Sequence, residues 1–339
     1  MRFTLTKEQH AFADTLHELL SAAGTPAIGR AWAGGDHAPG RALWGELADL
    51  GVWGLLVPEE HGGLGATPVD AVVAWEALGY HGVPGPVVET LGVAPRLLAG
   101  DGEVLAGIAA GELIATAALP PAVPRALDAD VADVLLRSDG VTVERCEPGA
   151  PEPETSIDPT RRLVAVPAGG TAVAAPQAGA FEHGVLGVSA QLVGAARRML
   201  DLATEYAAQR SQYGRVIGSY QSVKHLLADV AMRVEMARPV VYGAAVICGE
   251  PGGAGSVSPA VVRETSAAKV AATRTALLAA RTALQVHGAV GYTAEHDLGL
   301  WLTKARALAG AWGTADDHRR RVLATLTGGP AGSGGADVA

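Results

Sequence analysis

The sequence predicts a mainly α protein with a small β region in its middle, and three observations lead to this fold class. Hydrophobic residues make up 49% of the 339 residues and aromatic residues only 4%, which favours long Ala, Leu and Val helices over an aromatic-rich sandwich. Apolar residues recur at helical spacing before about residue 110 and after about residue 180. Short β-branched stretches lie between. A chain of this length can hold two or three packed units around a continuous core.

The first unit, residues 1–110, is expected to be a helical domain. Thr6 and Gln9 have the spacing of a capping box, so a helix should begin beside them. A further helical pattern covers about residues 39–50, and another one, around residues 69–78, follows a polar loop. The N-terminal unit should therefore contain several amphipathic or buried helices.

Residues 111–180 are expected to form a short β domain. Asp139 and Gly140 predict a turn, and the Pro-rich stretch 147–154 predicts a loop or an edge, because proline cannot donate to a central sheet. The β-branched stretches are residues 112–119, 133–147 and 161–169.

The third unit, residues 181–327, returns to long helical periodicity and is expected to be a helical bundle. A Gly, Pro and Ser segment at residues 249–259 should separate two of its helices. The end of the chain, residues 328–339, is low-complexity Gly, Ala and Ser sequence and is expected to be disordered.

Charge and cysteine usage exclude several classes of function. The formal net charge is −9 and no basic run occurs, which argues against a nucleic-acid partner. Charges interrupt the apolar positions of the N-terminal stretch, so we expect neither a signal peptide nor a membrane span, and a cytoplasmic location. Cys146 and Cys248 belong to no CxxC or Cys/His cluster, so no disulfide framework and no metal site is expected.

One candidate binding motif lies where a long helix is expected to end. Arg210, Gln212 and Tyr213 stand at that end, followed by a turn and a new helix. A guanidinium can bind phosphate oxygens in bidentate fashion, and backbone donors at a loop before a helix add to an anion site. The alternative is that Arg210 only caps the helix, since a cation is favoured at a helix C-terminus.

A second candidate motif begins at Gln285 and ends its helix at Gly288. Gln285 has an amide that can hydrogen-bond a cofactor, and Gly288 and Gly291 would let the backbone approach that cofactor closely. The alternative is that these glycines form only a helix C-cap and a turn.

These two motifs, in this order, resemble the acyl-CoA dehydrogenase family. The sequence FTLTKEQ near the start and the stretch 55–79 are also similar to that family, so the resemblance covers nearly the whole chain. The positions that match the family pattern in the C-terminal part are Arg210–Gly214, Gln221, Leu227–Asp229 and Gln285–Glu295.

The resemblance implies an N-terminal helical domain, a middle β domain and a C-terminal four-helix bundle that mediates oligomerisation. It also implies FAD-dependent α,β-dehydrogenation of an acyl-CoA thioester, in which a Glu removes the α-proton and flavin N5 accepts a hydride. Electrons then pass to an acceptor resembling electron-transfer flavoprotein. In the family the FAD lies between two subunits, and one subunit reaches across to the FAD of its neighbour. The residues that match those cross-subunit contacts are Arg210, Gln212, Tyr213, Gln285, Val286, Gly288 and Ala289.

The chain departs from the family at both positions where members carry the catalytic Glu. The first position is Trp312 and the second is Gly184, so we assign no catalytic residue in this chain. Glu182 lies two residues from the second position, which corresponds to about 200 degrees of rotation on a helix, and should face elsewhere. His183 is expected to be a surface or capping residue. Three further acids are expected to be solvated or to stabilise turns: Glu295, Asp316 and Asp317.

The middle domain also departs from the family. Working members resemble one another in a Thr-Glu-Pro-x-x-Gly-Ser-Asp loop and a Trp-Ile-Ser/Thr strand around the flavin ring, and the sequence contains neither. The hypothesis is that FAD is shared with a catalytically complete partner subunit in an α2β2 assembly. Such a chain is similar to the shortened subunits of actinobacterial steroid side-chain acyl-CoA dehydrogenases, and a shortened β domain would suit a fused-ring acyl group.

Three alternatives remain open from the sequence. One is a self-sufficient homotetrameric dehydrogenase with a displaced base such as Glu182. Another is a structural or acyl-CoA-binding subunit without redox chemistry, although retention of Arg210 and Gln285 counts against it. Without the resemblance, periodicity and composition indicate only a helical protein with a β insert and no assigned activity.

Overall fold

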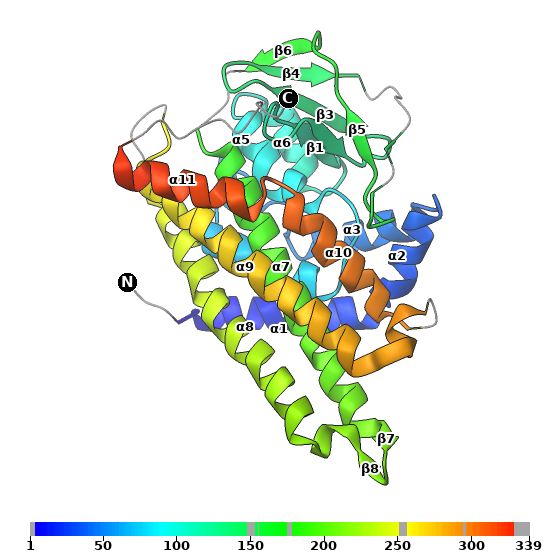
Figure 1. Ribbon diagram of the computed structural model, residues 1–339. Coiled ribbons are helices and arrows are strands. Elements are labelled where there is room, and N and C mark those ends of the chain that lie inside the picture. Colours follow the sequence, from blue (N-terminus) through cyan, green and yellow to red (C-terminus); the bar gives the residue numbers. More distant parts are fainter. Residues whose placement is uncertain are drawn as a thin grey trace.

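The protein is mainly α with a small β part, as the sequence predicts (Figure 1). The computed structural model describes residues 4–147, 153–154, 156–174, 178–250, 256–293 and 296–328. Of the tail expected to be disordered, residues 328–339, Gly328 is described and the rest lie outside the described residues. None of the helices in the described ranges is long and apolar enough to span a membrane.

Several helices form the N-terminal part, and the first begins where the sequence predicts. The Thr6 hydroxyl accepts a hydrogen bond from the Gln9 backbone, and the Gln9 side chain returns one to the Thr6 backbone, so the capping box is confirmed. Helices α2, α5 and α6 are not individually predicted from the sequence. The elements are α1 (Lys7–Ala22), α2 (Thr25–Ala33), α3 (Ala38–Asp49), α4 (Pro68–Tyr80), the π-helical turn η2 (Glu89–Val93), α5 (Ala94–Leu97) and α6 (Gly102–Ala109).

Short strands follow, in a four-stranded sheet of order β1-β3-β4-β6 and a separate pair, β2-β5. Strand β1 (Ala115–Ala118) pairs parallel with β3 (Val134–Ser138), whereas β4 (Val143–Cys146) and β6 (Thr171–Ala174) are antiparallel to their neighbours; β2 is Arg125–Leu127 and β5 is Leu163–Ala165. The predicted turn at Asp139 is confirmed, because its Oδ1 accepts hydrogen bonds from the amides of Val141 and Thr142 at 2.9 and 2.8 Å. Of the predicted loop 147–154, residues 148–152 lie outside the described residues.

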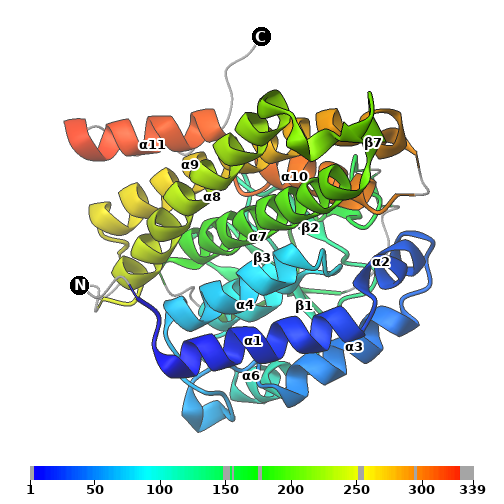
Figure 2. The same ribbon diagram turned by 90° about the horizontal axis from the view of Figure 1, so that it is seen from below.

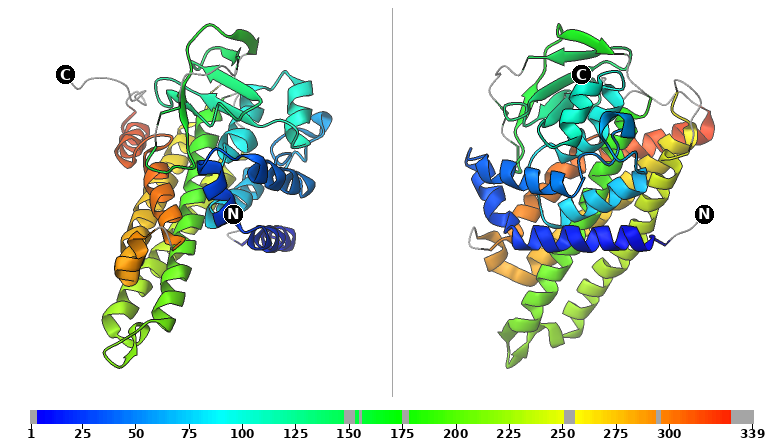
Figure 3. Two further views of the ribbon diagram at one scale, coloured as in Figure 1. Left: turned by 90° about the vertical axis from the view of Figure 1, so that its right-hand side faces the viewer. Right: turned by 180° about the vertical axis from the view of Figure 1, so that it is seen from behind.

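Long helices form the C-terminal part and run between the sheet and a small hairpin (Figures 1 and 3). The predicted breaks are confirmed at the hairpin and between α8 and α9. The elements are α7 (Ala180–Gln209), the hairpin strands β7 (Ser211–Gln212) and β8 (Arg215–Val216), α8 (Gln221–Cys248), α9 (Pro259–His287), the 3₁₀ turn η4 (Gly288–Tyr292), α10 (Leu298–Gly310) and α11 (Ala315–Thr327). Figure 2 shows α4 lying between α7 and the outer helix α1.

Helix α7 is the central element, and α4 crosses it at backbone contact distance. All residues from 182 to 196 are buried, which is typical of a helix covered on every side. A Cβ added at Gly194 would lie 2.0 Å from the Glu76 carbonyl oxygen, and one added at Gly79 would lie 2.3 Å from the Gln191 carbonyl oxygen. Only glycine permits this approach at both positions.

A buried carboxylate joins the same helices beside their crossing. Glu76 on α4 is 3% exposed and accepts hydrogen bonds from Arg197 on α7 and from Arg238 and Tyr242 on α8, at 2.6, 3.0 and 2.8 Å. Each carboxylate oxygen accepts hydrogen bonds from charged or hydroxyl donors. These bonds offset the free-energy cost of removing the Glu76 carboxylate from water.

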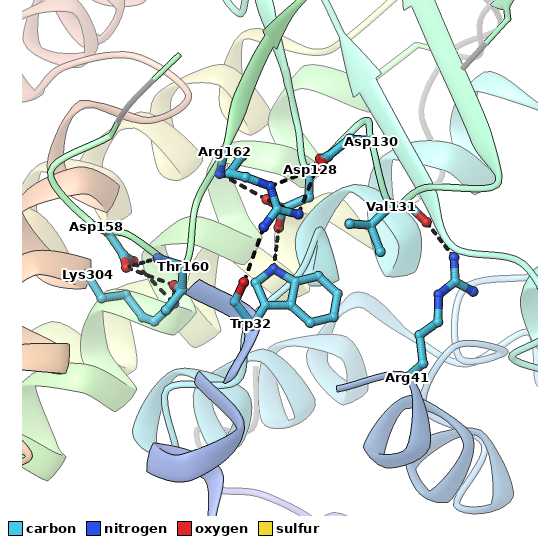
Figure 4. Close-up of polar contacts among 9 residues, drawn as sticks. All are labelled: Trp32, Arg41, Asp128, Asp130, Val131, Asp158, Thr160, Arg162 and Lys304. Carbon is cyan, nitrogen blue, oxygen red and sulfur yellow. Dashed lines mark hydrogen bonds and ion pairs between the residues drawn. The ribbon is translucent and has the colours of Figure 1, made fainter. Parts of the chain in front are cut away.

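A second polar network attaches the β part to the helices (Figure 4). Asp128 is fully buried; its Oδ2 accepts from Trp32 Nε1 at 3.3 Å and its Oδ1 from the Arg162 amide at 2.9 Å. Burial raises the pKa of Asp128 to about 7. A separate group of contacts lies beside it, in which Lys304 on α10 pairs with buried Asp158 at 3.4 Å. These contacts connect loops of the β part to α2 and α10.

Gly194→Ala should lower the free energy of unfolding by about 1–3 kcal/mol, because the new methyl group must push α4 and α7 apart. Urea unfolding of the full chain measures this. Gly243→Ala on α8 is the matched control, since its Cβ would meet nothing within 4 Å and alanine is favoured in a helix. Equal effects of the two substitutions would show that the crossing tolerates a methyl group.

Candidate functional site

The two candidate binding motifs lie at the same end of the bundle. The first follows the C-terminus of α7 and the second follows the C-terminus of α9, and both lie away from the sheet (Figure 1). Tyr206 near the end of α7 stacks on His287 at the end of α9, with ring centroids 4.5 Å apart. The packing of α7 against α9, which includes this aromatic contact, thus brings segments far apart in the sequence side by side.

Most residues of these motifs are presented to the outside of the chain. Tyr213 is 94% exposed and has φ of +50° in the hairpin, whereas Val286 is buried at 8% exposure. Gly288, with φ of +62°, ends α9 as the sequence predicts. The members that are exposed are Arg210, Gln212, Tyr213, Gln285, Gly288 and Ala289. The motif position Glu295 lies outside the described residues.

Arg210 is the C-cap residue of α7, and its charged side chain is exposed. Its backbone ends α7, with its amide donating to Tyr206, so part of the capping interpretation is correct. Within the described part of the chain, however, its exposed guanidinium has no carboxylate within 4 Å and no hydrogen-bond partner. Such a group fits a phosphate-bearing cofactor that approaches from outside the chain.

The two positions where family members carry the catalytic Glu lie against each other and are filled by one indole. Trp312, 3% exposed, follows α10 with φ of +57°. Its ring covers Gly184 on α7, where an added Cβ would lie 2.3 Å from ring atoms. The absence of a side chain at Gly184 is therefore what makes room for Trp312.

A buried acid that the sequence analysis missed faces this indole. Glu89, in the π-helical turn, is 4% exposed, and its Oε1 accepts a hydrogen bond from Trp312 Nε1 at 3.2 Å. Burial raises the pKa of Glu89, while the charge of Arg161 and the indole hydrogen bond act in the opposite direction. No local sequence signal marks Glu89, since only the fold brings it to Trp312.

The loop that carries Trp312 is held by α9 and α11. His318 donates from Nε2 to the Trp312 carbonyl at 2.8 Å, and its Nδ1 accepts from the Ser266 hydroxyl at 3.1 Å. This pattern requires a neutral imidazole, and burial lowers the pKa of His318 to about 4. Lys269 donates to the Leu308 carbonyl at 2.9 Å, and burial lowers the pKa of this fully buried lysine to about 7. The indole is thus fixed by its backbone as well as its ring.

The other acids near these positions are engaged in structural contacts. Glu182 pairs with Arg321 at 2.6 Å, so its carboxylate points away from Gly184, as the helical rotation predicts. Asp317 caps α11 through Thr314 and Asp316 pairs with Arg319, which confirms their stabilising role.

Of the two positions expected for His183, on the surface or as a cap at the helix start, the surface one is wrong. His183 is 3% exposed, and its neighbours include η2, where a Cβ added at Gly92 would lie 3.7 Å from the His183 Cβ, and Arg96 of α5. Its Nδ1 donates to the Gly179 carbonyl at 2.9 Å, so it does satisfy a carbonyl at the helix start.

Comparison with solved structures identifies the class to which this fold belongs. The chain superposes on a chain of the ChsE4-ChsE5 complex from Mycobacterium tuberculosis with a TM-score of 0.80 and 24% identity, covering 97% of this chain and 100% of that one. It superposes equally on the steroid acyl-CoA dehydrogenase Tcur3481-Tcur3483, with a TM-score of 0.80, 21% identity and coverage of 97% and 100%. The fold is that of acyl-CoA dehydrogenases.

Sequence comparisons define the family. The model of the acyl-CoA dehydrogenase N-terminal domain matches residues 6–104, and that of the C-terminal domain matches residues 170–327. Acyl-CoA dehydrogenase IpdE2 of Mycolicibacterium smegmatis is 32% identical over 95% of this chain and 100% of its own length. The chain belongs to the acyl-CoA dehydrogenase family. The two domain matches leave out residues 105–169, where strands β1 to β5 lie.

Gly184→Ala should lower the free energy of unfolding by about 1–3 kcal/mol in the natural chain and by much less when Trp312 is replaced by Leu. The reason is that the three heavy atoms nearest to an added Cβ all belong to the indole ring, at 2.3–2.5 Å. Urea unfolding of the two single variants and the double variant measures the coupling. Strictly additive effects would mean that the indole does not depend on Gly184.

The free energy of unfolding should fall as the pH drops from about 6.5 to about 4. His318 has its pKa lowered from 6.5 to about 4, so in this window the unfolded chain binds a proton that the folded chain excludes. The loss for this residue is roughly 3 kcal/mol over the window. His318→Gln should make urea-derived stability less dependent on pH, whereas the exposed control His225→Gln should not.

Proposed function

We propose that this chain is the base-lacking subunit of a heteromeric FAD-dependent acyl-CoA dehydrogenase. The observation that carries this proposal is the indole of Trp312, which occupies the place of both family base positions over Gly184. Neither of these two positions then carries a carboxylate to remove an α-proton, and the neighbouring Glu89 is buried and bonded to the indole. A partner subunit that retains the catalytic Glu and the loops around the flavin ring supplies both.

The contribution of this chain is to hold the FAD of its partner. The residues for this role are those at the hairpin end of the bundle, with Arg210 on the pyrophosphate and Gln285 as a hydrogen-bonding amide. Their exposure in the single chain, away from the sheet, supports contacts with another subunit. The flavin, when bound, accepts the hydride, while this chain orients it and neutralises phosphate charge.

The assembly that follows is an α2β2 tetramer with one FAD for each pair of unlike chains. The likeness to a chain of the ChsE4-ChsE5 complex supports a partner of the same fold. An acceptor resembling electron-transfer flavoprotein completes the reaction, as the family resemblance implies.

The substrate that we propose is a steroid side-chain acyl-CoA thioester. The likeness to a steroid acyl-CoA dehydrogenase supports this class. The shortened middle region is consistent with it, because a smaller β part leaves more room beside the site for a fused-ring acyl group.

Purified alone, the chain should carry no flavin, and co-expressed with its dehydrogenase-like partner it should yield a yellow heterotetramer. Flavin absorbance and native mass measure this, and the expected content is one FAD for each unlike pair. The same complex should turn over a steroid acyl-CoA and leave butyryl-CoA nearly unused. A yellow, active homotetramer of this chain alone would contradict the proposal.

Arg210→Ala should weaken FAD retention in the complex, because a charge-assisted contact to phosphate contributes about 1.5–3 kcal/mol. The rate of FAD loss during gel filtration and the flavin content per complex measure the effect. Arg306→Ala, an exposed arginine on α10, is the control. If flavin content is equal in the two variants, Arg210 is only a helix cap.

A further inference from the structure

A large cavity lies at the opposite end of α7 from the hairpin. Its volume is about 1130 Å³, and its lining comes from the start of α7, the α5 region, the end of α8 and the start of α9. Apolar walls come from Leu56, Pro95, Ile247 and Val261. Neither the cross-subunit motifs nor Trp312 lines it, so it is separate from the proposed FAD-holding role.

Arg96 is the cation of this cavity. It lines the cavity and is partly buried, and its Nη2 lies 3.4 Å from Nε2 of buried His183. Because the Gly179 carbonyl can only accept, Nδ1 of His183 carries the proton and Nε2 is left as an acceptor toward Arg96. The imidazole is therefore neutral, and the positive charge of Arg96 is not balanced by it.

Arg96 differs from three other arginines at the contacts between helices, although Arg198, which lies over the rings of Tyr80 and Trp301, also lacks a carboxylate partner within the described ranges. Arg197, Arg238 and Arg321 each lie within 4 Å of a carboxylate, whereas Arg96 has none within that distance among the described residues. The stretches 175–177 and 251–255, next to lining residues in the sequence, contain no Asp or Glu. A partly desolvated guanidinium without a counter-ion is costly, and a bound anion would remove that cost.

We propose that this cavity binds a free carboxylic acid with a hydrocarbon chain, with its carboxylate on Arg96. The planar guanidinium matches a carboxylate in bidentate geometry, and the apolar walls take the hydrocarbon chain. Glu60 and Glu250 also line the cavity; both are exposed and more than 4 Å from Arg96. Their charge opposes a dianionic phosphate more than a single carboxylate, which selects the monoanion.

The test is displacement of a fluorescent fatty acid, dansyl-aminoundecanoate, from the full chain in the assembly in which it purifies. Decanoate should displace the probe, whereas decan-1-ol and inorganic phosphate should not at equal concentration. Equal displacement by decan-1-ol would show an apolar pocket without an anion site, and displacement by phosphate alone would show a simple anion site. Either result would overturn the proposal.

Two variants locate the site. Arg96→Gln should weaken decanoate binding at least tenfold, equivalent to about 1.4 kcal/mol, and the control Arg274→Gln, an exposed arginine on α9, should leave it unchanged. Val261→Trp should also weaken probe binding, because the indole takes up part of the cavity wall while Arg96 remains. Thermal unfolding checks that each variant is folded. Unchanged affinity in Arg96→Gln or in a folded Val261→Trp would place the ligand elsewhere and overturn the proposal.

Discussion

The close crossing of α4 and α7 is the contact on which the rest of the structure depends. Gly79 and Gly194 allow the two backbones to touch, and Glu76 then reaches Arg197 and Arg238 on the bundle helices. Because α7 is buried on every side along its first half, its position sets where both of its ends lie. One end carries Gly184 and the neighbouring cavity, and the other carries Arg210 and the hairpin. The crossing therefore fixes the positions of both ends of α7, one beside the cavity and the other at the hairpin.

Positions 312 and 184, which the family resemblance matches to the places of a catalytic Glu, are surrounded by residues that pack in a complementary way. The indole of Trp312 needs the space that Gly184 leaves, and its Nε1 needs the carboxyl of Glu89. The backbone below it relies on a neutral His318 and on the buried Lys269. A carboxylate at position 312 alone would lack this complementary environment, since the indole's volume and hydrogen bond would both be lost. The packing is that of an interior, consistent with a subunit that leaves proton removal to its partner.

Charged side chains in this structure differ in whether they have a partner of opposite charge inside the chain. Buried carboxylates such as Glu76 and Asp128 have donors inside the chain, and their partners lie across boundaries between the N-terminal helices, the β part and the bundle. Arg210 and Arg96 have no carboxylate within 4 Å in the described part of the chain. Because arginine stays charged at any physiological pH, each of these two is best matched by an anion from outside the chain.

The sequence by itself determined the features that depend on local signals. The capping box at Thr6, the turn at Asp139 and the helix end at Gly288 follow from residues a few positions apart, and the structure confirms each. The order of its motifs also sufficed to indicate the family. Tertiary structure alone decided that Trp312 fills the space above Gly184, that Glu89 faces it, and that His183 is buried. Those contacts join segments more than a hundred residues apart, or depend on a helix being covered by others, and no local pattern encodes such packing.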